Sequence, residues 1–507
     1  MIQDNTPILV GVGQVTEKGV PVADASSPLD LIEQAAYLAA EDAGLDKNVL
    51  TDLDTLVIVR GFREPTKNSP AVIQRRIGAA KAQAFLTPHG GNNPQYLVNR
   101  YAEAITKGEN RLVLFAGSEA MDTSRRIVKE GGTPDWEEAD DQDATYLFPD
   151  VDMSNNYENA HGIFPPASIY PMFENAVRQK YGRSIADHQL EMGKLFSRFT
   201  KVAATSPHAW YPIERSAEEI ATATPQNRYV GWPYTKFMNA MNQINQSAAI
   251  LMTSVGEARK MGIPEDKFTY LHGCADAAEI WHVQDRVNYH SSPAIREIGK
   301  QAFDMAGMTL NDVDFIDIYS CFPVAVEIAC DELGLAKDDP RGLTITGGLP
   351  FHGGAGNNYV MNSIAAMVDK VRGKPGSIGL VTANGGYLTK HAAGIYSTTP
   401  TEGQWQRVDP ATYQAKIDAM PRPTVIEEAN GDAVIETYTV LFGRTNEPEA
   451  AIVIGRLGDA VTQDAPRFLS LVTADADTLT RMTQTDYMGA KGSVSHKDGR
   501  NFFTPAA

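Results

Sequence analysis

His89-Gly90-Gly91-Asn92-Asn93 and His352-Gly353-Gly354-Ala355-Gly356-Asn357-Asn358 are two versions of one phrase, and they stand 263 residues apart. Two further phrases recur in the same order. Ser26-Ser27-Pro28 returns after 265 residues as Ser291-Ser292-Pro293, and segment 52–59 returns after 260 residues as segment 312–319. Three repeats at nearly one spacing predict a duplicated structural unit. Because matching loops of such a unit meet across its pseudo-twofold axis, we expect the two His-Gly-Gly loops to lie close together.

Segments with strand and helix patterns alternate around these phrases. Strands are expected at 7–13, 56–59 and 111–116 in the first half, and at 315–319 and 378–382 in the second. Helices are expected at 29–45, 96–107, 294–306 and 324–333, with one more that ends at Val371. This alternation predicts an α/β fold with a parallel sheet that is covered on both faces.

Two regions depart from this alternation. Residues 121–245 are rich in Asp, Pro and aromatic residues, with a helical segment at 167–181, and we interpret them as a loop domain inserted between strands and able to fold over an active site. Segments 248–255 and 267–271 read again as strands. Past residue 400, β-branched segments at 435–442, 451–457 and 467–472 predict a small all-β domain, of a size that suits an oligonucleotide-binding (OB) barrel. The predicted domains are therefore residues 1–274, 275–404 and 405–507.

Composition narrows the range of partners. The formal net charge is −18, and residues 422–507 alone carry 8 Lys and Arg against 12 Asp and Glu, which argues against nucleic acid and anionic membranes as ligands. The chain has three cysteines (Cys274, Cys321 and Cys330) and no Cys/His cluster with zinc-site spacing. We therefore expect no disulfide framework, no metal and a reducing, cytoplasmic setting. No segment approaches the roughly 20 apolar residues of a membrane helix.

The duplicated layer, the long insertion and the glycine phrases together resemble the thiolase superfamily over about residues 7–400. Ala116-Gly117-Ser118-Glu119-Ala120-Met121 is similar to the thiolase phrase Gly-Gly-x-Glu-Ser-Met. Asn245-Gln246-Ser247-Ala248-Ala249 is similar to the stretch that thiolases place beside the pantetheine arm of coenzyme A, which assigns Ser247 and Ala248 to coenzyme binding. Within the superfamily, the sterol-carrier-protein-type thiolases and the thiolase-like proteins with an extra C-terminal β-domain are most similar. Proteins of this kind are often labelled acetyl-CoA acetyltransferase.

The resemblance implies two stacked βαβαβ layers (an αβαβα sandwich) and coenzyme A as a substrate or product, not as a tightly bound cofactor. It also implies two catalytic cysteines, and neither is present. The nucleophile of a thiolase stands at the start of the third helix of its first half, where helix amides favour a thiolate, and this position falls on Gly91. The acid/base cysteine of the last glycine loop falls on Thr382. The ping-pong route of a classical thiolase is therefore not expected.

The remaining family loops supply the candidate catalytic residues. Tyr319-Ser320-Cys321-Phe322 matches the His-Asp-Cys-Phe loop of the sterol-carrier branch at its last two residues only. His352 stands two residues nearer the preceding double glycine than the family histidine, so it takes the oxyanion-hole role only if the loop is shorter. Asn93 and Asn384 can donate to a thioester oxygen. Ser320 can be an activated nucleophile if His352 lies within hydrogen-bonding distance, and Tyr319 can donate a proton to a substrate hydroxyl or take one from it. Each candidate has a purely structural alternative: a glycine-rich turn before a capped helix for His352, helix capping or a turn for the two asparagines, a turn for Ser320, and packing for Tyr319 and Cys321.

The predicted function is that of a thiolase-like protein acting on acyl-CoA thioesters in lipid metabolism, an acyltransferase by family. Retro-aldol cleavage of a 3-hydroxyacyl-CoA is the first alternative, because it needs a base and a stabilised enolate but no acyl-cysteine. A non-catalytic acyl-CoA-binding module is the second. The subunit state is expected to be a monomer or a thiolase-type homodimer.

Overall fold

The computed structural model describes residues 2–138, 140, 142–472 and 474–506. Each half of the body opens with a strand and a helix whose first turn is set by the repeated Ser-Ser-Pro phrase. Ser27 caps α1 (Pro28–Asp42), Ser292 caps α10 (Pro293–Ala306), and a proline stands at the start of both helices. The preceding strands also match, because Gly11 in β1 and Gly273 in β8 let the backbone of the following helix approach closely. A Cβ at either glycine would lie 1.9 or 2.0 Å from a helix carbonyl oxygen.

The two halves form one nine-stranded sheet with mirrored strand order. The first half contributes β1 (Pro7–Thr16), β2 (Thr55–Val59), β3 (Gln83–Leu86), β4 (Leu112–Ala120) and β7 (Asn245–Ser254), and the second contributes β8 (Thr269–Ala278), β9 (Phe315–Asp317), β10 (Ile378–Gly385) and β11 (Lys390–Ser397). The order is β3-β2-β4-β7-β1-β8-β11-β10-β9. Among the described residues, strand pairing joins the halves only at Ile8 with Tyr270 and Leu9 with Thr269, so the pseudo-twofold axis passes between β1 and β8.

The prediction of a parallel sheet is wrong for the inner strands. β2 is parallel to β3 and β4, and β9 is parallel to β10, but β7 and β11 run antiparallel to both of their neighbours. For β11 the physical reason is the short connection before it, whereas β7 follows the long insertion, whose length allows either strand direction. The segment before β11 is a four-residue turn after β10, which joins antiparallel neighbours, whereas a parallel neighbour needs a crossover of a dozen residues or more.

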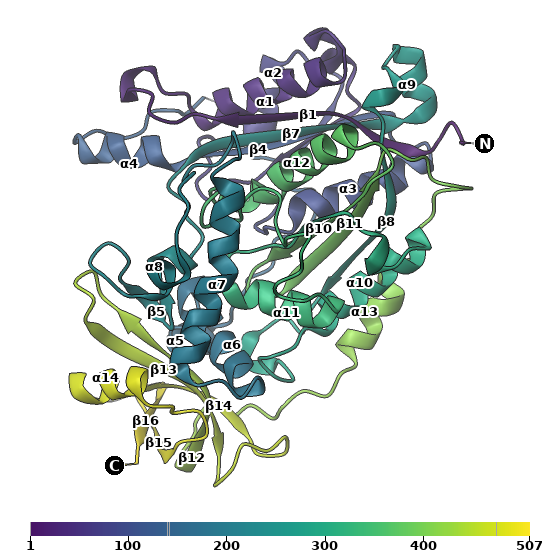
Figure 1. Ribbon diagram of the computed structural model, residues 1–507. Coiled ribbons are helices and arrows are strands. Elements are labelled where there is room, and N and C mark those ends of the chain that lie inside the picture. The colour runs from purple at the N-terminus through teal and green to yellow at the C-terminus, as the bar shows by residue number, and fades with distance from the viewer. Residues whose placement is uncertain (1, 139, 141, 473, 507) are drawn as a thin grey trace.

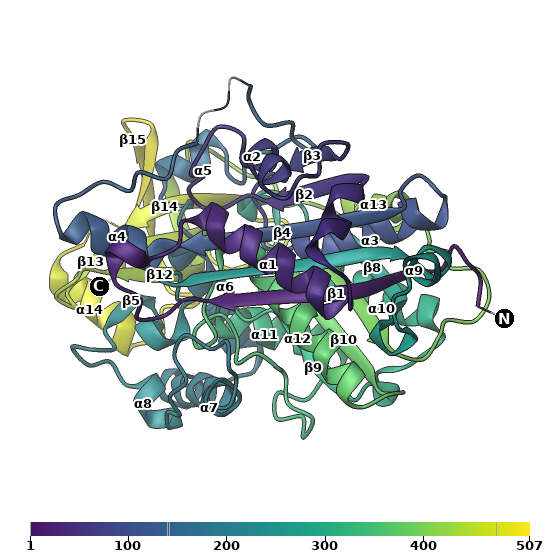
Figure 2. The ribbon, with the colours of Figure 1, turned by 90° about the horizontal axis from the view of Figure 1, so that it is seen from above.

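Helices complete five layers, as the thiolase-like α/β sandwich requires. α3 (Asn93–Thr106) and α12 (Tyr359–Gly373) pack against each other and against strands of both halves, so they form the central layer. Figure 1 shows them between β1, β4 and β7 above and β8, β10 and β11 below. The outer layers are made by α1, α2 (Ser69–Arg76) and α9 (Val255–Met261) on one side, and by α10 and α11 (Pro323–Leu333) on the other. Figure 2, seen from above, shows α1 lying across the strands of the first half.

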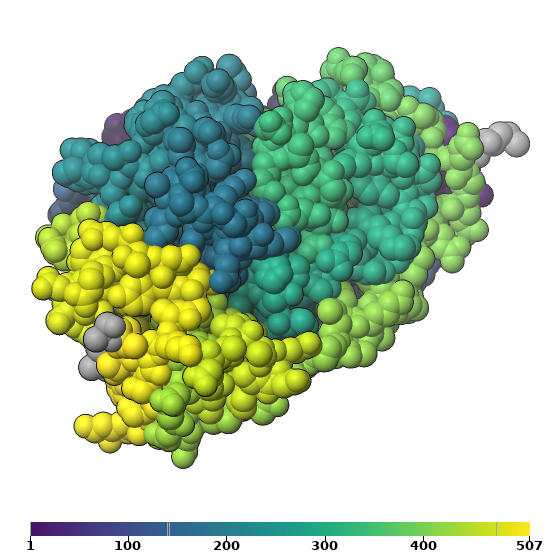
Figure 3. Space-filling model, turned by 60° about the horizontal axis from the view of Figure 1, so that its bottom comes forward, coloured from purple at the N-terminus to yellow at the C-terminus, as the bar shows by residue number. Residues whose placement is uncertain are grey.

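The insertion and the C-terminal region share a second sheet. The insertion holds α4 (Met121–Lys129), α5 (Asn156–Ala160), α6 (Pro166–Lys180), α7 (Ile185–Ala203), α8 (Ala217–Ala221), β5 (Tyr229–Trp232) and β6 (Tyr234–Thr235). The C-terminal region holds α13 (Pro410–Asp418), β12 (Gly431–Phe442), β13 (Pro448–Leu457), β14 (Arg467–Val472), α14 (Ala476–Gln484), β15 (Lys491–Lys497) and β16 (Arg500–Pro505). β12 pairs with both β13 and β15, which closes a five-stranded barrel, and β5 pairs with the outer part of β12. In Figure 3 this yellow barrel lies directly against the blue insertion at one end of the molecule.

Within these described residues, no helix is both long and apolar enough to cross a membrane.

Candidate active site between the two halves

The two His-Gly-Gly loops meet, as the duplication predicts. The Asn357 side chain accepts a hydrogen bond from the Gly90 amide at 3.0 Å, and its Nδ2 lies 3.2 Å from Nδ1 of His89. Each loop also reaches a strand of the opposite half. Asn358 donates to the Gly117 carbonyl in β4 at 2.7 Å, and Asn92 Oδ1 lies where a side chain on Gly385 in β10 would begin. Residues far apart in sequence are thereby brought to the starts of the central helices α3 and α12.

Gly91, which the family resemblance aligns with the thiolase nucleophile, has no room for any side chain. A Cβ built there would lie 2.5 Å from the Tyr319 hydroxyl and 2.6 Å from the carbonyl oxygen of Asn384. The phenol of Tyr319 therefore stands where the side chain of a nucleophile would start. Tyr319 fills the space that a cysteine side chain at position 91 would need, so the missing cysteine and the tyrosine have the same packing cause.

Tyr319 is also the predicted catalytic residue that keeps some exposure. It is only partly buried, whereas the other five (Asn93, Ser320, Cys321, His352 and Asn384) are at most 7% exposed. Burial of the phenol raises its pKa well above the usual value, so the group stays protonated and has a hydrogen to donate to a ligand. The backbone amide of Tyr319 donates to Thr382 Oγ1 at 3.1 Å. Thr382, which the resemblance aligns with the acid/base cysteine, therefore holds the Tyr319 backbone in place.

Asn384 and Cys321 lie together under a tyrosine from the insertion. Asn384 Nδ2 donates to the hydroxyl of Tyr170 at 2.9 Å and lies 3.8 Å from Cys321 Sγ. The Tyr170 ring stacks on Phe322, with 4.4 Å between ring centres, and its hydroxyl donates to the Gly386 carbonyl at 2.9 Å. Burial raises the pKa of Cys321 to about 12, so this thiol is no nucleophile at neutral pH.

His352, like Asn384 Oδ1, is a buried polar group of the site that lacks a hydrogen-bond partner among the described residues. It is 1% exposed, and neither ring nitrogen meets the geometry of a hydrogen bond among the described residues, although a weaker polar contact with the Thr346 backbone opposes the fall of its pKa. Buried polar groups are nearly always hydrogen-bonded, so an orphaned imidazole indicates a place that a water or ligand group occupies. Its ring lies 5.8 Å from that of Tyr359, which in turn lies 5.9 Å from that of Tyr319. His352 and Tyr319 thus flank one tyrosine.

Ser320 lies next to Tyr319 in the chain, but no base lies within hydrogen-bonding distance to activate it as a nucleophile among the described residues. Its hydroxyl accepts from the Leu349 amide at 3.3 Å and packs against Gly348, where a Cβ would lie 2.5 Å away. No hydrogen bond joins Ser320 to His352 in the part of the chain that the structure describes. The turn interpretation of Ser320 accounts for these contacts.

The other three predicted site residues are Asn93, Ser247 and Ala248. Among the described residues they form no hydrogen bond with Tyr319, Ser320, Cys321, His352 or Asn384. Asn93 donates to Pro88 O at 2.6 Å and to Thr87 Oγ1 at 3.1 Å, which ties the first His-Gly-Gly loop to its own helix. Ser247 and Ala248 are fully buried in β7 between β1 and β4, and Ser247 donates to the Gly117 carbonyl at 2.8 Å. Their assignment to coenzyme A stays a prediction.

Three residues near the loops were not predicted. Tyr170 and Tyr359 are aromatic residues inside helices, and no local signal separates them from core residues. Glu119, the last residue but one of β4, accepts from the Phe62 amide at 2.7 Å and lies against Gly356, where no Cβ would fit. Burial raises the pKa of the Glu119 carboxyl to about 8. Its place in the phrase that resembles thiolases was the only available signal.

The buried imidazole of His352 makes stability depend on pH. Burial lowers its pKa to about 3, below the 6.5 expected of an unfolded histidine. The unfolded chain therefore binds the extra proton between pH 6.5 and 3, and the stabilisation is full above pH 6.5 and lost as the pH falls. We expect His352→Asn to remove up to about 1.4 kcal/mol per pH unit from the slope of stability against pH in this window.

Urea unfolding at pH 5, 6, 7 and 8 measures this slope. The control is His496→Asn, at a partly exposed position of β15. Parallel curves for wild type and His352→Asn would show that the imidazole titrates alike in the folded and unfolded chains.

Comparison with known proteins agrees with this architecture. The family model for a thiolase C-terminal domain-like unit matches residues 275–398, and the model for the additional C-terminal domain of thiolase-like protein type 1 matches residues 412–500. The chain is 22% identical over 323 residues to an acetyl-CoA acetyltransferase of Methanothermobacter thermautotrophicus, covering 63% of this chain and 76% of that protein. It is 25% identical over 381 residues to the 17-hydroxy-3-oxo-4-pregnene-20-carboxyl-CoA lyase of Mycobacterium tuberculosis, covering 71% of this chain and 92% of that protein.

One solved structure matches over the whole length. The monomeric SCP2-thiolase-like protein type 1 of Mycobacterium smegmatis is 39% identical, with a TM-score of 0.86 and full coverage of both chains. The sandwich, the insertion and the added barrel therefore occur together in a known structure. The chain belongs to the SCP2-thiolase-like protein type 1 family of the thiolase superfamily.

Proposed function

We propose that the chain acts on acyl-CoA thioesters without an acyl-cysteine, and that its reaction is retro-aldol cleavage of a 3-hydroxyacyl-CoA. The observation that carries this proposal is the Tyr319 hydroxyl at the position where the nucleophile would begin. Retro-aldol cleavage forms no covalent enzyme intermediate, so it does not need the missing side chain. The mycobacterial relative that bears the name of a carboxyl-CoA lyase supports the same class of reaction.

His352 and Tyr319 have complementary protonation states for this reaction. Burial keeps His352 neutral, so one ring nitrogen has a free lone pair. The 3-hydroxyl proton passes to this nitrogen, the C2–C3 bond breaks, and its electron pair moves to the thioester carbonyl oxygen. An aldehyde or ketone leaves, while Tyr319 donates a hydrogen bond to the enolate oxygen. The proton then moves from His352 to C2, which yields the shortened acyl-CoA.

A non-catalytic acyl-CoA-binding module is the second candidate, and the burial of the site favours it. Five of the six predicted catalytic side chains are at most 7% exposed, so substrate has to displace packed residues to reach them. Tyr170 and Phe199, from helices α6 and α7 of the insertion, lie over Asn384 and Gly348. A catalytic role therefore requires the insertion to move away from the body when substrate binds.

The decisive experiment is chromatography with mass detection on a panel of 3-hydroxyacyl-CoA and 3-oxoacyl-CoA thioesters, with and without free coenzyme A. We expect shortening of the 3-hydroxyacyl thioesters in the absence of free coenzyme A. Tyr319→Phe is expected to lower kcat by about 100-fold, since it removes a single donor to the enolate. Tyr270→Phe, in the separate core around α1, is the matched control.

Two other outcomes would reject the retro-aldol proposal. Cleavage of 3-oxoacyl thioesters that depends on free coenzyme A would indicate thiolysis through another nucleophile. Tight binding of the thioesters with no turnover of any of them would indicate the binding module.

A further inference from the structure

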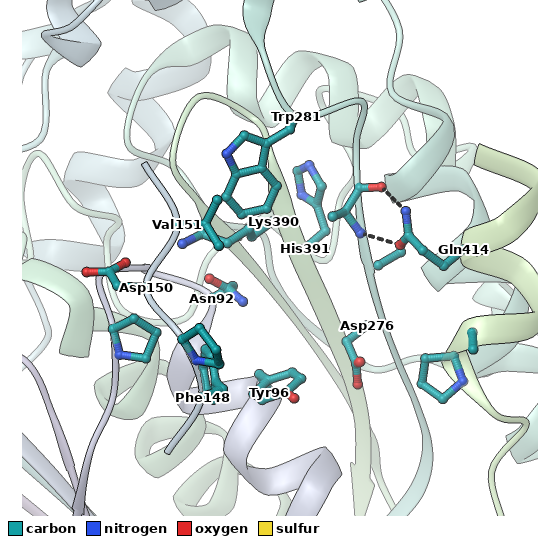
Figure 4. A pocket seen from close by; sticks show the side chains of 16 residues that line it. Asn92, Tyr96, Phe148, Asp150, Val151, Asp276, Trp281, Lys390, His391 and Gln414 are labelled. Atoms are coloured by element: carbon teal, nitrogen blue, oxygen red, sulfur yellow. Dashed lines mark hydrogen bonds between the residues drawn. The ribbon is translucent and has the colours of Figure 1, made fainter. Parts of the chain in front are cut away.

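A second candidate site lies on the other side of the Asn92–Gly385 contact. A cavity of about 380 Å³ opens between β8, β11, the start of α3, residues 148–151 and α13. This volume falls in the range of small-molecule sites. Figure 4 shows Asn92 near its centre, with Trp281 and His391 on one side and Phe148 and Tyr96 on another.

Three aromatic side chains (Tyr96, Phe148 and Trp281) stand among the apolar residues of the cavity wall, and they are held in place. Tyr96 and Phe148 meet edge to face, with ring centres 5.3 Å apart, and Trp281 is anchored by its indole N–H, which donates to the Asp152 carbonyl at 2.8 Å. Gln414 of α13 bonds to both backbone groups of Ala278, at 2.8 and 2.9 Å, which fixes α13 as one wall. Such walls suit a flat apolar body.

Lys390 places a positive charge in the cavity lining. Among the described residues, no carboxylate lies within ion-pair distance of it. Its ammonium group donates to the His89 carbonyl and lies 5.6 Å from the Trp281 ring centre. The two carboxylates of the lining are already paired, Asp276 with Arg407 at 2.5 Å and Asp150 with Arg60 at 3.2 Å. Burial lowers the pKa of Lys390, which reflects the cost of holding this charge without an anion. An anionic ligand group would relieve that cost.

Two buried polar groups of the lining also lack partners. Asn92 is 7% exposed and His391 is 2% exposed, and Asn92 Oδ1 and His391 Nε2 have no hydrogen-bond partner among the described residues. Burial holds the pKa of His391 near 3, so the imidazole is neutral at physiological pH. A hydrogen bond to the backbone at Leu388 uses one ring nitrogen, and Nε2 remains as an acceptor. An acceptor that faces a cavity calls for a hydroxyl on the ligand.

We infer that this cavity binds a small organic carboxylate with a flat apolar body and a hydroxyl group. The carboxylate pairs with Lys390, the ring lies among Tyr96, Phe148 and Trp281, and the hydroxyl donates to His391. Because no thioester takes part, this inference is independent of the proposed reaction and is tested separately.

Isothermal titration calorimetry with three probes tests each element of the inference. The probes are 4-hydroxyphenylacetate, phenylacetate without the hydroxyl, and 4-hydroxyphenylethanol without the carboxylate. We expect 4-hydroxyphenylacetate to bind the wild type about tenfold more tightly than either of the others. In Lys390→Met the advantage over the alcohol should vanish, whereas Lys491→Met, at an exposed site on β15, should leave all three affinities unchanged.

Phe148→Ala provides a second variant if Lys390→Met fails to fold, because Phe148 is partly exposed and lies in a loop. It should weaken all three probes alike, by about tenfold. Equal affinity of the wild type for the acid and the alcohol would overturn the inference. So would unchanged binding in Lys390→Met, or no binding of any probe at 5 mM, roughly the weakest affinity of interest.

Discussion

Gly91→Ala is expected to destabilise the protein by about 3 kcal/mol, because it inserts a methyl group into a fully packed place. The new Cβ would meet the Tyr319 hydroxyl at 2.5 Å and the Asn384 carbonyl oxygen at 2.6 Å. The phenol can move aside, but the carbonyl belongs to strand β10 and cannot. Gly91→Cys should lose at least as much stability and should gain no thiolysis. Urea unfolding at pH 7 measures the first effect, and the acyl-CoA panel measures the second.

Two further variants separate this packing effect from a general cost of replacing glycine. Gly373→Ala, at the end of α12, has no heavy atom within 4 Å of its new Cβ and should change stability by less than about 1 kcal/mol. In Gly91→Ala/Tyr319→Ala the two effects should fall short of their sum, since the smaller side chain removes one of the clashes. Strict additivity would mean that Tyr319 does not fill the position of the nucleophile.

Arg467→Met is expected to lower stability by about 3–5 kcal/mol and to loosen the C-terminal barrel. Arg467 is fully buried in β14 and binds Glu436 through two hydrogen bonds, at 2.6 and 2.9 Å. It also donates to the carbonyls of Gln284 and Arg286, at 2.8 and 2.5 Å, in the second half of the body. Removing the guanidinium leaves two carbonyls unpartnered and leaves Glu436 with Arg456 alone.

Urea unfolding and limited proteolysis of residues 398–430 measure this effect. Arg481→Met, on the exposed face of α14, is the matched control and should remain within about 0.5 kcal/mol of the wild type. If Arg467→Met resisted protease as well as the control, other contacts would hold the barrel to the body.

Much of the body could be predicted from short-range patterns. The segment 7–13, the helix that Pro28 begins and the paired Ser-Ser-Pro phrases all correspond to elements of the structure, because periodicity and capping act within a few residues. β15 and β16 were missed, since β15 is polar apart from Gly492 and Val494, and the two phenylalanines of β16 are adjacent and show no strand-like alternation. Strand direction was misjudged at β7 and β11, because a strand's apolar pattern is the same in either direction.

The candidate site, like the fold, has some features that the sequence predicts and others that only tertiary contacts decide. The sequence by itself determined that the chain is duplicated, that its two His-Gly-Gly loops correspond, and that both thiolase cysteines are missing. Only the tertiary structure decided that Tyr319 occupies the space beside Gly91, that Tyr170 from the insertion covers Asn384, and that Lys390 lines a cavity beside Trp281 with no carboxylate of the described residues at ion-pair distance. The reason is physical: patterns along the chain report which face of an element is buried. Contacts between residues hundreds of positions apart depend instead on how close-packed layers exclude or admit each side chain.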